Sequence, residues 1–195
     1  MGAQAAVPPV NLIQNGSFEE NLITSGSWDI LYNGQLFDWA TGKYGVELRN
    51  QVAGDAQDGL NFVELDTTKN SWMSQTVNIS TAGSYLLSFW YNSRPDNGTR
   101  PANTDKLSWS FAGQDGEVMK NYTSDNSSTW SQFTRTFTFG APTSLTLKFS
   151  AKGVSDSYGG SLDNVSLTNI TPVPEPETYA MMLAGLGLMV TIARR

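Results

Sequence analysis

The reactive chemistry open to this chain rests on its carboxylates, because its 195 residues include no histidine and no cysteine. A Ser-His-Asp triad, a histidine general base, thiolate chemistry and nearly all zinc sites are thereby excluded. Glycoside hydrolysis by two carboxyl groups is the hydrolytic chemistry that remains. The candidates are Glu47, Glu64 and Asp66, and the last two would share one strand face, being two residues apart. A solvated strand face has the same pattern, so we expect no enzyme.

The charge balance narrows the class of partner. The net charge is −6, and the body has no basic stripe, so we expect no nucleic-acid partner. Charged residues make up only 15% of the chain, whereas Ser, Thr, Asn and Gly are abundant. This composition favours strands and turns over helices, because short polar side chains compete with helical hydrogen bonds. A neutral polymer such as a polysaccharide is compatible with it.

Apolar periodicity predicts an all-β fold. Residues 83–92 are apolar on both faces, which predicts a central strand buried on both sides. Residues 130–139 alternate phenylalanine with threonine, as a half-buried strand does. Further predicted strands cover residues 45–49, 61–66, 71–79, 106–111, 145–149 and 161–167. Turn-forming clusters separate these runs at the spacing of an antiparallel sandwich, and no helical period appears before residue 176.

The chain divides into four segments. Residues 1–10 are the remnant of a signal peptide or a disordered lead, because Ala3-Gln4-Ala5 has the form of a signal-peptidase site. No basic or apolar stretch precedes that site, so we expect most of the signal peptide to lie upstream of Met1. Residues 11–170 form one β-sandwich domain. A stiff Pro/Glu linker at 171–178 leads to a hydrophobic helix and basic end at 179–195.

The uncharged run from Tyr179 to Ala193 predicts a short hydrophobic helix. Such a helix is about 22 Å long, so it crosses a hydrocarbon core of about 30 Å only marginally. Snorkelling of Arg194 and Arg195 would help, and these arginines predict a cytoplasmic C-terminus with the body outside. A buried helix of the domain is the alternative, although a β-domain has little use for a Pro-isolated segment that is apolar all round.

The order of parts in the tail is specific. Pro174-Glu175-Pro176 precedes the apolar run and the pair Arg194-Arg195, and this order resembles the PEP-CTERM sorting signal. The resemblance implies recognition by an exosortase, a membrane-embedded enzyme that removes the tail in bacteria that make exopolysaccharide. It implies an exported protein that lies transiently in the inner membrane through residues 179–195. The final location would be the cell surface or extracellular matrix of a Gram-negative-type bacterium.

Motifs also bracket the body. NLIQNGSFE at Asn11–Glu19 opens it, NFVELD at Asn61–Asp66 and SQTV at Ser74–Val77 lie inside it, and GSLDNVSL at Gly160–Leu167 closes it. This order resembles the galactose-binding-like jelly rolls of carbohydrate-binding modules and of related wall-associated proteins. The resemblance implies an antiparallel jelly-roll β-sandwich in which the first and last strands pair.

In many such modules a structural Ca²⁺ lies at the junction of the first and last strands. The resemblance carries its carboxylate ligands over to Glu19 and Asp163, together with backbone carbonyls. Calcium accepts such mixed oxygen ligands at about 2.3–2.6 Å. The alternative is that both carboxylates only cap turns and accept backbone amides.

The same resemblance implies sugar binding through exposed aromatic rings, on a concave sheet face or in edge loops. Our candidates are Trp90, Trp109 and Arg94, and we expect the two tryptophans to share a sheet face. The alternative for either tryptophan is a place in the core. We predict a non-catalytic surface or matrix protein that binds carbohydrate such as exopolysaccharide. A passive coat protein without a dedicated ligand is the alternative, and a carboxylate-based glycan-active enzyme is least favoured.

Overall fold

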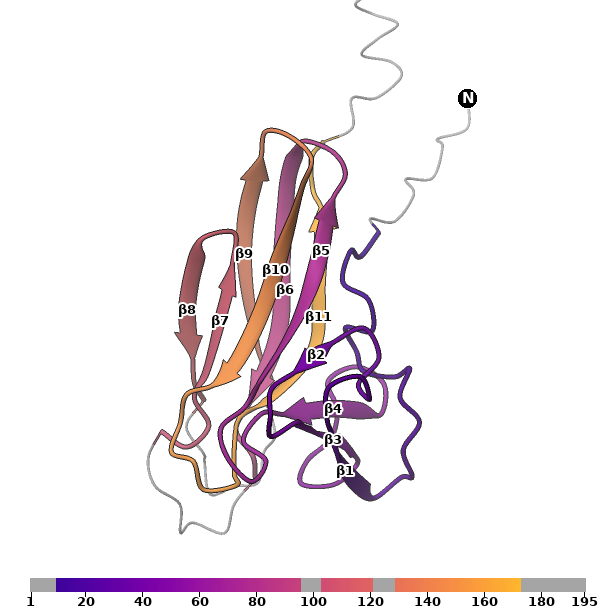
Figure 1. The fold of residues 1–195 in the computed structure, drawn as a ribbon, viewed down its shortest axis with the longest axis vertical. Coiled ribbons are helices and arrows are strands. Elements are labelled where there is room, and N and C mark those ends of the chain that lie inside the picture. Colours follow the sequence, from indigo (N-terminus) through magenta and orange to yellow (C-terminus); the bar gives the residue numbers. More distant parts are fainter. Residues whose placement is uncertain (1–9, 96–102, 121–128, 173–195) are drawn as a thin grey trace, which may run out of the picture.

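Two antiparallel sheets pack face to face in the computed structural model, which describes residues 10–95, 103–120 and 129–172 (Figure 1). Within these ranges one sheet has the strand order β1-β3-β4-β11-β6-β9 and the other has the order β2-β5-β10-β7-β8. The strands are β1 (Ser27–Leu31), β2 (Ala40–Thr41), β3 (Val46–Asn50), β4 (Asn61–Glu64), β5 (Trp72–Ile79), β6 (Gly83–Asn92), β7 (Leu107–Phe111), β8 (Gln114–Val118), β9 (Ser131–Phe139), β10 (Thr143–Ala151) and β11 (Ser161–Asn169). The predicted all-β antiparallel jelly-roll sandwich is confirmed.

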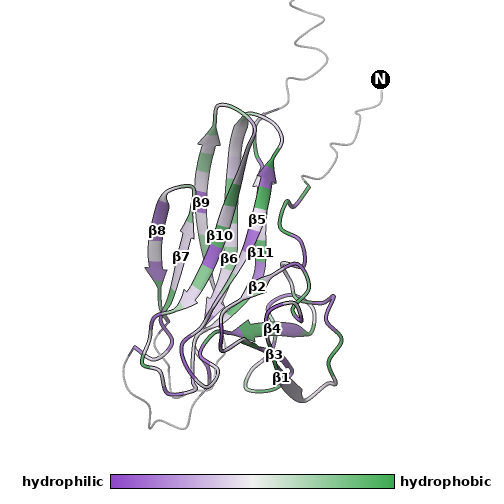
Figure 2. Cartoon of the chain, in the orientation of Figure 1, coloured by the Kyte–Doolittle hydropathy of each residue, from purple (hydrophilic) through white to green (hydrophobic). Residues whose placement is uncertain are grey.

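Alternation along the strands builds the core between the sheets. Hydrophobic and hydrophilic residues alternate along β5 and β10 (Figure 2), so each strand directs one apolar row inward. Phe89 of β6 stacks on Phe133 of β9 with ring centroids 4.7 Å apart, and it meets Phe149 of β10 edge-on at 5.0 Å. Burying each of these rings stabilises the fold by about 1.5–3 kcal/mol.

Strand β6 takes the central position that its sequence predicts, between β11 and β9. Tyr85, Leu87 and Phe89 point into the core. Leu86 and Trp90 lie on the opposite face, where they are half-buried rather than enclosed. The prediction of burial on both sides therefore holds fully for the inner face only, because the outer face of this sheet has no third layer across β6.

The opening segment lies beside the last strand, as the resemblance implies. Asn11 forms a β-bridge with Thr168, and the Leu12 amide donates to the Leu167 carbonyl at 2.9 Å. Further along, the Val165 amide donates to the Gly16 carbonyl at 2.9 Å. A Cβ atom at Gly16 would lie 2.1 Å from the Val165 oxygen, so only glycine allows this close approach.

The sandwich has two poles. At one pole the chain leaves the domain beside the β5–β6 turn, where the Ser84 amide donates to the Thr171 hydroxyl at 2.8 Å. At the other pole lie β1, β3 and β4 with the loops around them (Figure 1). The predicted linker and hydrophobic helix, from residue 173 onward, and the lead at residues 1–9 lie outside the described residues. No helix in the described part is long and apolar enough to cross a membrane.

Candidate functional site

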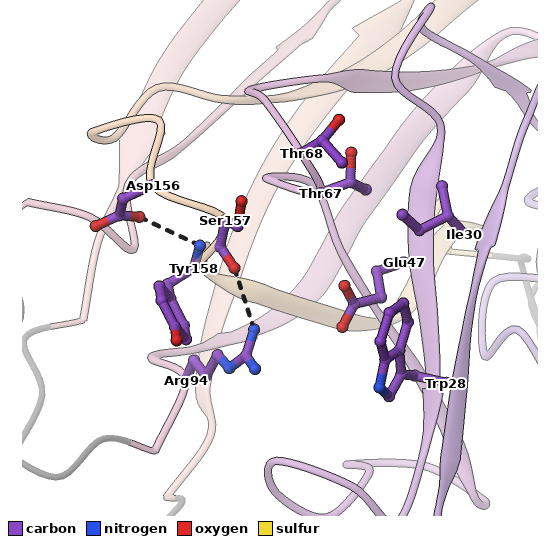
Figure 3. A pocket seen from close by; sticks show the side chains of 9 residues that line it. All are labelled: Trp28, Ile30, Glu47, Thr67, Thr68, Arg94, Asp156, Ser157 and Tyr158. Carbon is purple, nitrogen blue, oxygen red and sulfur yellow. Dashed lines mark hydrogen bonds between the residues drawn. The ribbon is translucent and has the colours of Figure 1, made fainter.

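A pocket of about 440 Å³ opens on the outer face of the six-stranded sheet, at the pole of β1, β3 and β4 (Figure 3). Val46 and Leu48 of β3 belong to the core, so Glu47 between them points outward. The register places Ile30 of β1 opposite Glu47, and both residues line the pocket. The alternation of inward and outward side chains along β1 and β3 therefore supplies one wall and the floor of the pocket.

A buried ionic cluster underlies that floor. Glu47 and Glu64 are register partners on β3 and β4, so their side chains share the outer face. The Arg49 guanidinium group, which is fully buried, forms ion pairs with both carboxylates. The distance from Arg49 Nε to Glu47 Oε1 is 2.6 Å. Removing one member of such a cluster leaves an uncompensated buried charge, which costs about 3–5 kcal/mol.

Burial raises the pKa of Glu64 to about 8, while the nearby guanidinium groups of Arg49 and Arg94 act in the opposite direction. Glu64 is fully buried. Its Oε1 atom accepts the Gly159 amide at 2.7 Å. All the contacts that the structure shows for the Glu64 side chain are with other protein groups, and no part of it reaches solvent.

Glu64 and Asp66 position the loop that forms the opposite wall, residues 153–159. Asp66 Oδ2 accepts the amides of Asp156 at 2.9 Å and Ser157 at 3.1 Å. Asp66 is fully buried, and burial raises the pKa of its carboxyl group. Both carboxylates are thus loop anchors rather than members of a solvated strand face. The spacing predicted a shared strand face, but β4 ends at Glu64 and Asp66 lies just beyond it, and the burial of both side chains was not predicted.

The anchored loop presents Tyr158 to the pocket. The Asp156 carboxylate accepts the Thr104 hydroxyl at 2.8 and 2.7 Å and the Tyr158 amide at 3.2 Å. Ser157 has a φ of 67°, a left-handed conformation that is unfavourable for residues other than glycine. The hydrogen bonds to Asp66 and Asp156 hold this turn in place, so the ring of Tyr158 has a defined position.

Arg94, which we predicted as a ligand-binding residue, lies in the pocket and connects its floor to its wall. It follows the end of β6 and directs Nη1 to 3.4 Å from Glu64 Oε2 and 3.3 Å from the Ser157 carbonyl oxygen. Its guanidinium carbon lies 4.5 Å from the centroid of the Tyr158 ring. This stacking is a cation–π contact that fixes both side chains.

Two aromatic rings border the pocket and remain open to solvent. Trp28 is 54% exposed and Tyr158 is 40% exposed. Trp28 comes from β1, and Tyr158 comes from the 153–159 loop (Figure 3). The hydroxyl-bearing side chain of Thr68 and the carboxylates of Glu47 and Asp156 stand between or beside them. The pocket therefore combines flat apolar surfaces with hydrogen-bonding groups, as small-ligand sites do.

The predicted tryptophans lie elsewhere. Trp109 is 5% exposed and lies in the core, where Phe133 and Phe137 cover its ring, so a ligand has no access to it. Trp90 lies on the outer face of the six-stranded sheet, where its register partners are Asp163 and Gln132. It does not line the pocket. The two tryptophans belong to different sheets and do not share a face.

Sequence reasoning missed Trp28 and Tyr158. Trp28 lies in a short strand, SWDIL, whose alternation is too brief to distinguish from a loop. Tyr158 lies in a Gly/Ser/Asp loop, and hydrogen bonds to carboxylates far along the chain hold that loop in place. A usable signal was the pairing of an aromatic residue with turn-forming residues directly before the closing motif.

The two predicted calcium ligands, Glu19 and Asp163, both accept backbone amides of one segment, residues 57–61. Asp163 Oδ2 accepts the amides of Gln57 at 2.7 Å and Asp58 at 2.9 Å. Glu19 Oε1 accepts the amides of Leu60 at 2.8 Å and Asn61 at 2.6 Å. Burial raises the pKa of Asp163 to about 7.

These contacts with backbone amides are those expected if Glu19 and Asp163 only cap turns, which is the alternative to a metal site. In the described part of the chain, no three His, Cys, Asp or Glu residues are arranged so that they could hold a metal ion together. A Ca²⁺ ion here would therefore take Glu19 and Asp163 as its two carboxylates and complete its shell with carbonyl oxygens or water. The residue types fit calcium, and its presence stays a prediction.

Comparison with known proteins identifies the tail. Residues 172–195 match the PEP-CTERM protein-sorting motif. The tail is a sorting signal. This motif implies exosortase-dependent sorting and an exported protein of a Gram-negative-type bacterium. No curated protein matches the chain.

Solved structures resemble the body. The carbohydrate-binding module TmCBM61, in complex with β-1,4-galactotriose, has a TM-score of 0.55 and 17% identity, over 82% of this chain and 99% of that one. A family 16 carbohydrate-binding module has a TM-score of 0.48 and 19% identity, over 82% of this chain and 100% of that one. A family 35 module from Clostridium thermocellum has a TM-score of 0.44 and 18% identity, over 72% of this chain and 97% of that one. At this identity the TmCBM61 likeness establishes the sandwich fold alone.

Proposed function

We propose that this protein is a non-catalytic carbohydrate-binding protein of the bacterial surface or extracellular matrix, with its binding site in the pocket between Trp28 and Tyr158. The observation that carries the proposal is the pair of half-exposed aromatic rings over a floor of fixed polar groups. The fold shared with TmCBM61, whose structure holds a galactotriose, supports it.

The pocket chemistry suits a sugar ring. One face of a pyranose presents C–H groups that pack on an aromatic ring, while its hydroxyl groups need acceptors and donors at the edge. Trp28 and Tyr158 offer the flat surfaces, the Glu47 carboxylate offers an acceptor, and Thr68 offers a hydroxyl. Since Tyr158 is fixed by Arg94 and by its loop anchors, little ordering entropy is lost when a ligand binds.

The carboxylates do not favour hydrolysis. Glycosidases need two carboxyl groups that flank the scissile bond and reach it. Glu64 is fully buried under protein contacts, and Asp66 is buried while it holds the 153–159 loop. Glu47 and Asp156 line the pocket from different sides, but Glu47 is paired with Arg49, and Asp156 accepts the Thr104 hydroxyl and the Tyr158 amide. We therefore propose binding without catalysis, and measured turnover of a bound glycan would contradict this.

The sorting motif supplies the second part of the proposal. We propose that an exosortase removes the tail while residues 179–195 lie in the inner membrane. The domain would then reach the cell surface or matrix, where exopolysaccharide is its natural ligand. In a strain that lacks its exosortase, we expect the full chain to stay in the membrane fraction.

The direct test is binding to a panel of oligosaccharides and bacterial exopolysaccharides, measured by glycan array and confirmed by calorimetry. We expect Trp28→Ala to weaken binding about 5- to 30-fold, since one lost stacking surface costs about 1–2 kcal/mol. Phe37→Ala is the matched control, because Phe37 is 53% exposed and lies outside the pocket. Equal loss in both variants, or no glycan bound by the wild type, would leave a passive coat protein as the better account.

A further inference from the structure

We propose that the pocket takes a neutral sugar residue and discriminates against uronic acids and other anionic sugars. This inference rests on the carbohydrate binding proposed above and adds the chemical class of the ligand. It follows from which charged groups face the pocket and from how each of them is already engaged.

Negative charge reaches the pocket from two elements. Glu47 of β3 lines it, and its carboxylate is directed into the space between Trp28 and Arg94 (Figure 3). Its Oε1 atom contacts Arg49 Nε at 2.6 Å. Asp156, from the 153–159 loop, lines another side, where its oxygens accept the Thr104 hydroxyl. Both carboxylates are hydrogen-bond acceptors that a sugar hydroxyl can use.

The cations near the pocket are all engaged by protein groups: the two arginines contact carboxylates, and a lysine lies over an aromatic ring. Arg94 faces the pocket but lies against Glu64, the Ser157 carbonyl and the Tyr158 ring. Arg49 is fully buried between Glu47 and Glu64. Lys69, the residue after Thr68, directs its ammonium group over the Tyr44 ring, 5.7 Å from the centroid.

The local balance is therefore acidic. The carboxyl groups of Glu47, Glu64, Asp66 and Asp156 outnumber the guanidinium groups of Arg49 and Arg94. With Glu64 protonated, the three remaining carboxylates still outnumber the two guanidinium groups, and Lys69 lies over the Tyr44 ring rather than in the pocket lining. The whole chain carries a net charge of −6, which adds to the repulsion of a polyanion.

A neutral hydroxymethyl group can donate to Glu47 or Asp156, whereas a sugar carboxylate would meet like charge in a half-enclosed site. Like-charge contact of this kind is costly because the site is partly screened from water. We expect at least a tenfold weaker affinity for the acid, which corresponds to about 1.4 kcal/mol.

The experiment compares matched ligands on the full chain. A neutral trisaccharide that binds in the array is titrated by calorimetry beside the same trisaccharide oxidised at C6 to the uronic acid. The C6 amide of that acid is a control of equal size without charge. We expect the neutral sugar and the amide to bind similarly and the acid at least tenfold more weakly, with the gap narrowing at 1 M NaCl, where screening acts over about 3 Å.

Variants then locate the cause. Glu47→Gln keeps an acceptor and removes the charge, so it should narrow the gap between acid and neutral sugar. If Glu47→Gln fails to fold because Arg49 loses a partner, Asp156→Asn provides the same comparison from the other wall. An acid that binds as tightly as the neutral sugar overturns this inference and leaves the pocket assignment intact. A chain that binds no glycan at all overturns the proposed function instead.

Discussion

Arg49 is a fully buried guanidinium group, and its position requires carboxylates on both sides. Glu47 and Glu64 fill those places from β3 and β4, and Nη1 of Arg49 has no hydrogen-bond partner in the described part of the chain. A buried charge of this kind is tolerated only when it is paired. Two of the carboxylates that a sequence search offers as a catalytic pair are therefore committed to an ionic cluster.

The raised pKa values predict that the protein loses stability as pH rises. Burial raises the pKa of Glu64 from 4.5 to about 8 in the folded chain, although Arg49 and Arg94 act against this rise, so below that pKa the Arg49 charge is balanced mainly by Glu47. Folding thus takes up a proton between these values, and the free energy of unfolding falls by up to about 1.4 kcal/mol per pH unit. Asp163 acts in the same direction between about 3.8 and 7.

Urea denaturation at pH 5, 6.5 and 8 measures this slope. We expect the wild type to be most stable at pH 5 and Glu64→Gln to show a shallower fall, because glutamine does not titrate. Glu117→Gln is the control, because Glu117 is exposed and its ion pair with Lys106 lies at the surface. Stability that rises across this range would contradict the prediction, as would a slope that Glu64→Gln leaves unchanged.

At the scale of elements, the sequence reveals strands wherever two-residue alternation is long. β5, β6, β9 and β10 were predicted within a few residues of their bounds, because apolar residues alternate with polar ones along β5, β9 and β10 and β6 is a long apolar run. β1, β2 and β8 were missed. β8 reads QDGEV, with four polar or glycine residues, and it becomes a strand only because β7 pairs with it.

The pocket was harder to predict than the fold because its parts are joined by long-range contacts. The Glu64–Gly159 hydrogen bond joins residues 95 apart, and the Asp66–Ser157 bond joins residues 91 apart. Local pattern carries no information on such pairs. Arg94 was found because it lies two residues beyond the most apolar strand, whereas the place of Trp28 depends on the register of β1 with β3.

The segment 57–61 has two carboxylate anchors, and calcium is predicted to act through them. We expect Ca²⁺ at about 100 times its Kd to stabilise the domain by about 2.7 kcal/mol, which raises the melting temperature by about 5–10 °C. Glu19→Gln should abolish this response, because it removes one of the two carboxylates that accept amides of this segment and are predicted to bind calcium. Melting curves with Ca²⁺ and with a chelator are the measurement, and Glu117→Gln again serves as a surface control. An identical melting temperature in both conditions would favour simple amide capping.

At the scale of the whole domain, the pocket and the point where the chain leaves the described sandwich lie at opposite poles. The chain leaves the domain at Thr171, beside Ser84 at the start of β6, and Arg94 of the pocket follows the end of the same strand (Figure 1). Ten strand residues separate these points, a length of about 33 Å. A domain attached to a membrane through its tail would thus direct the pocket away from the bilayer, toward extracellular polymer.

This arrangement predicts a difference in distance to the membrane that fluorescence can measure. The chain has no cysteine, so Thr68→Cys at the pocket rim and Ala82→Cys at the tail pole each provide a single labelling site. In the full chain reconstituted into liposomes, energy transfer to a lipid-bound acceptor should be much stronger from position 82 than from position 68, because transfer falls steeply with distance. Flotation of the liposomes shows whether residues 179–195 anchor the chain at all. Equal or reversed transfer in floated samples would show that the domain does not hold its pocket outward, and the pocket would then face the membrane surface rather than the matrix.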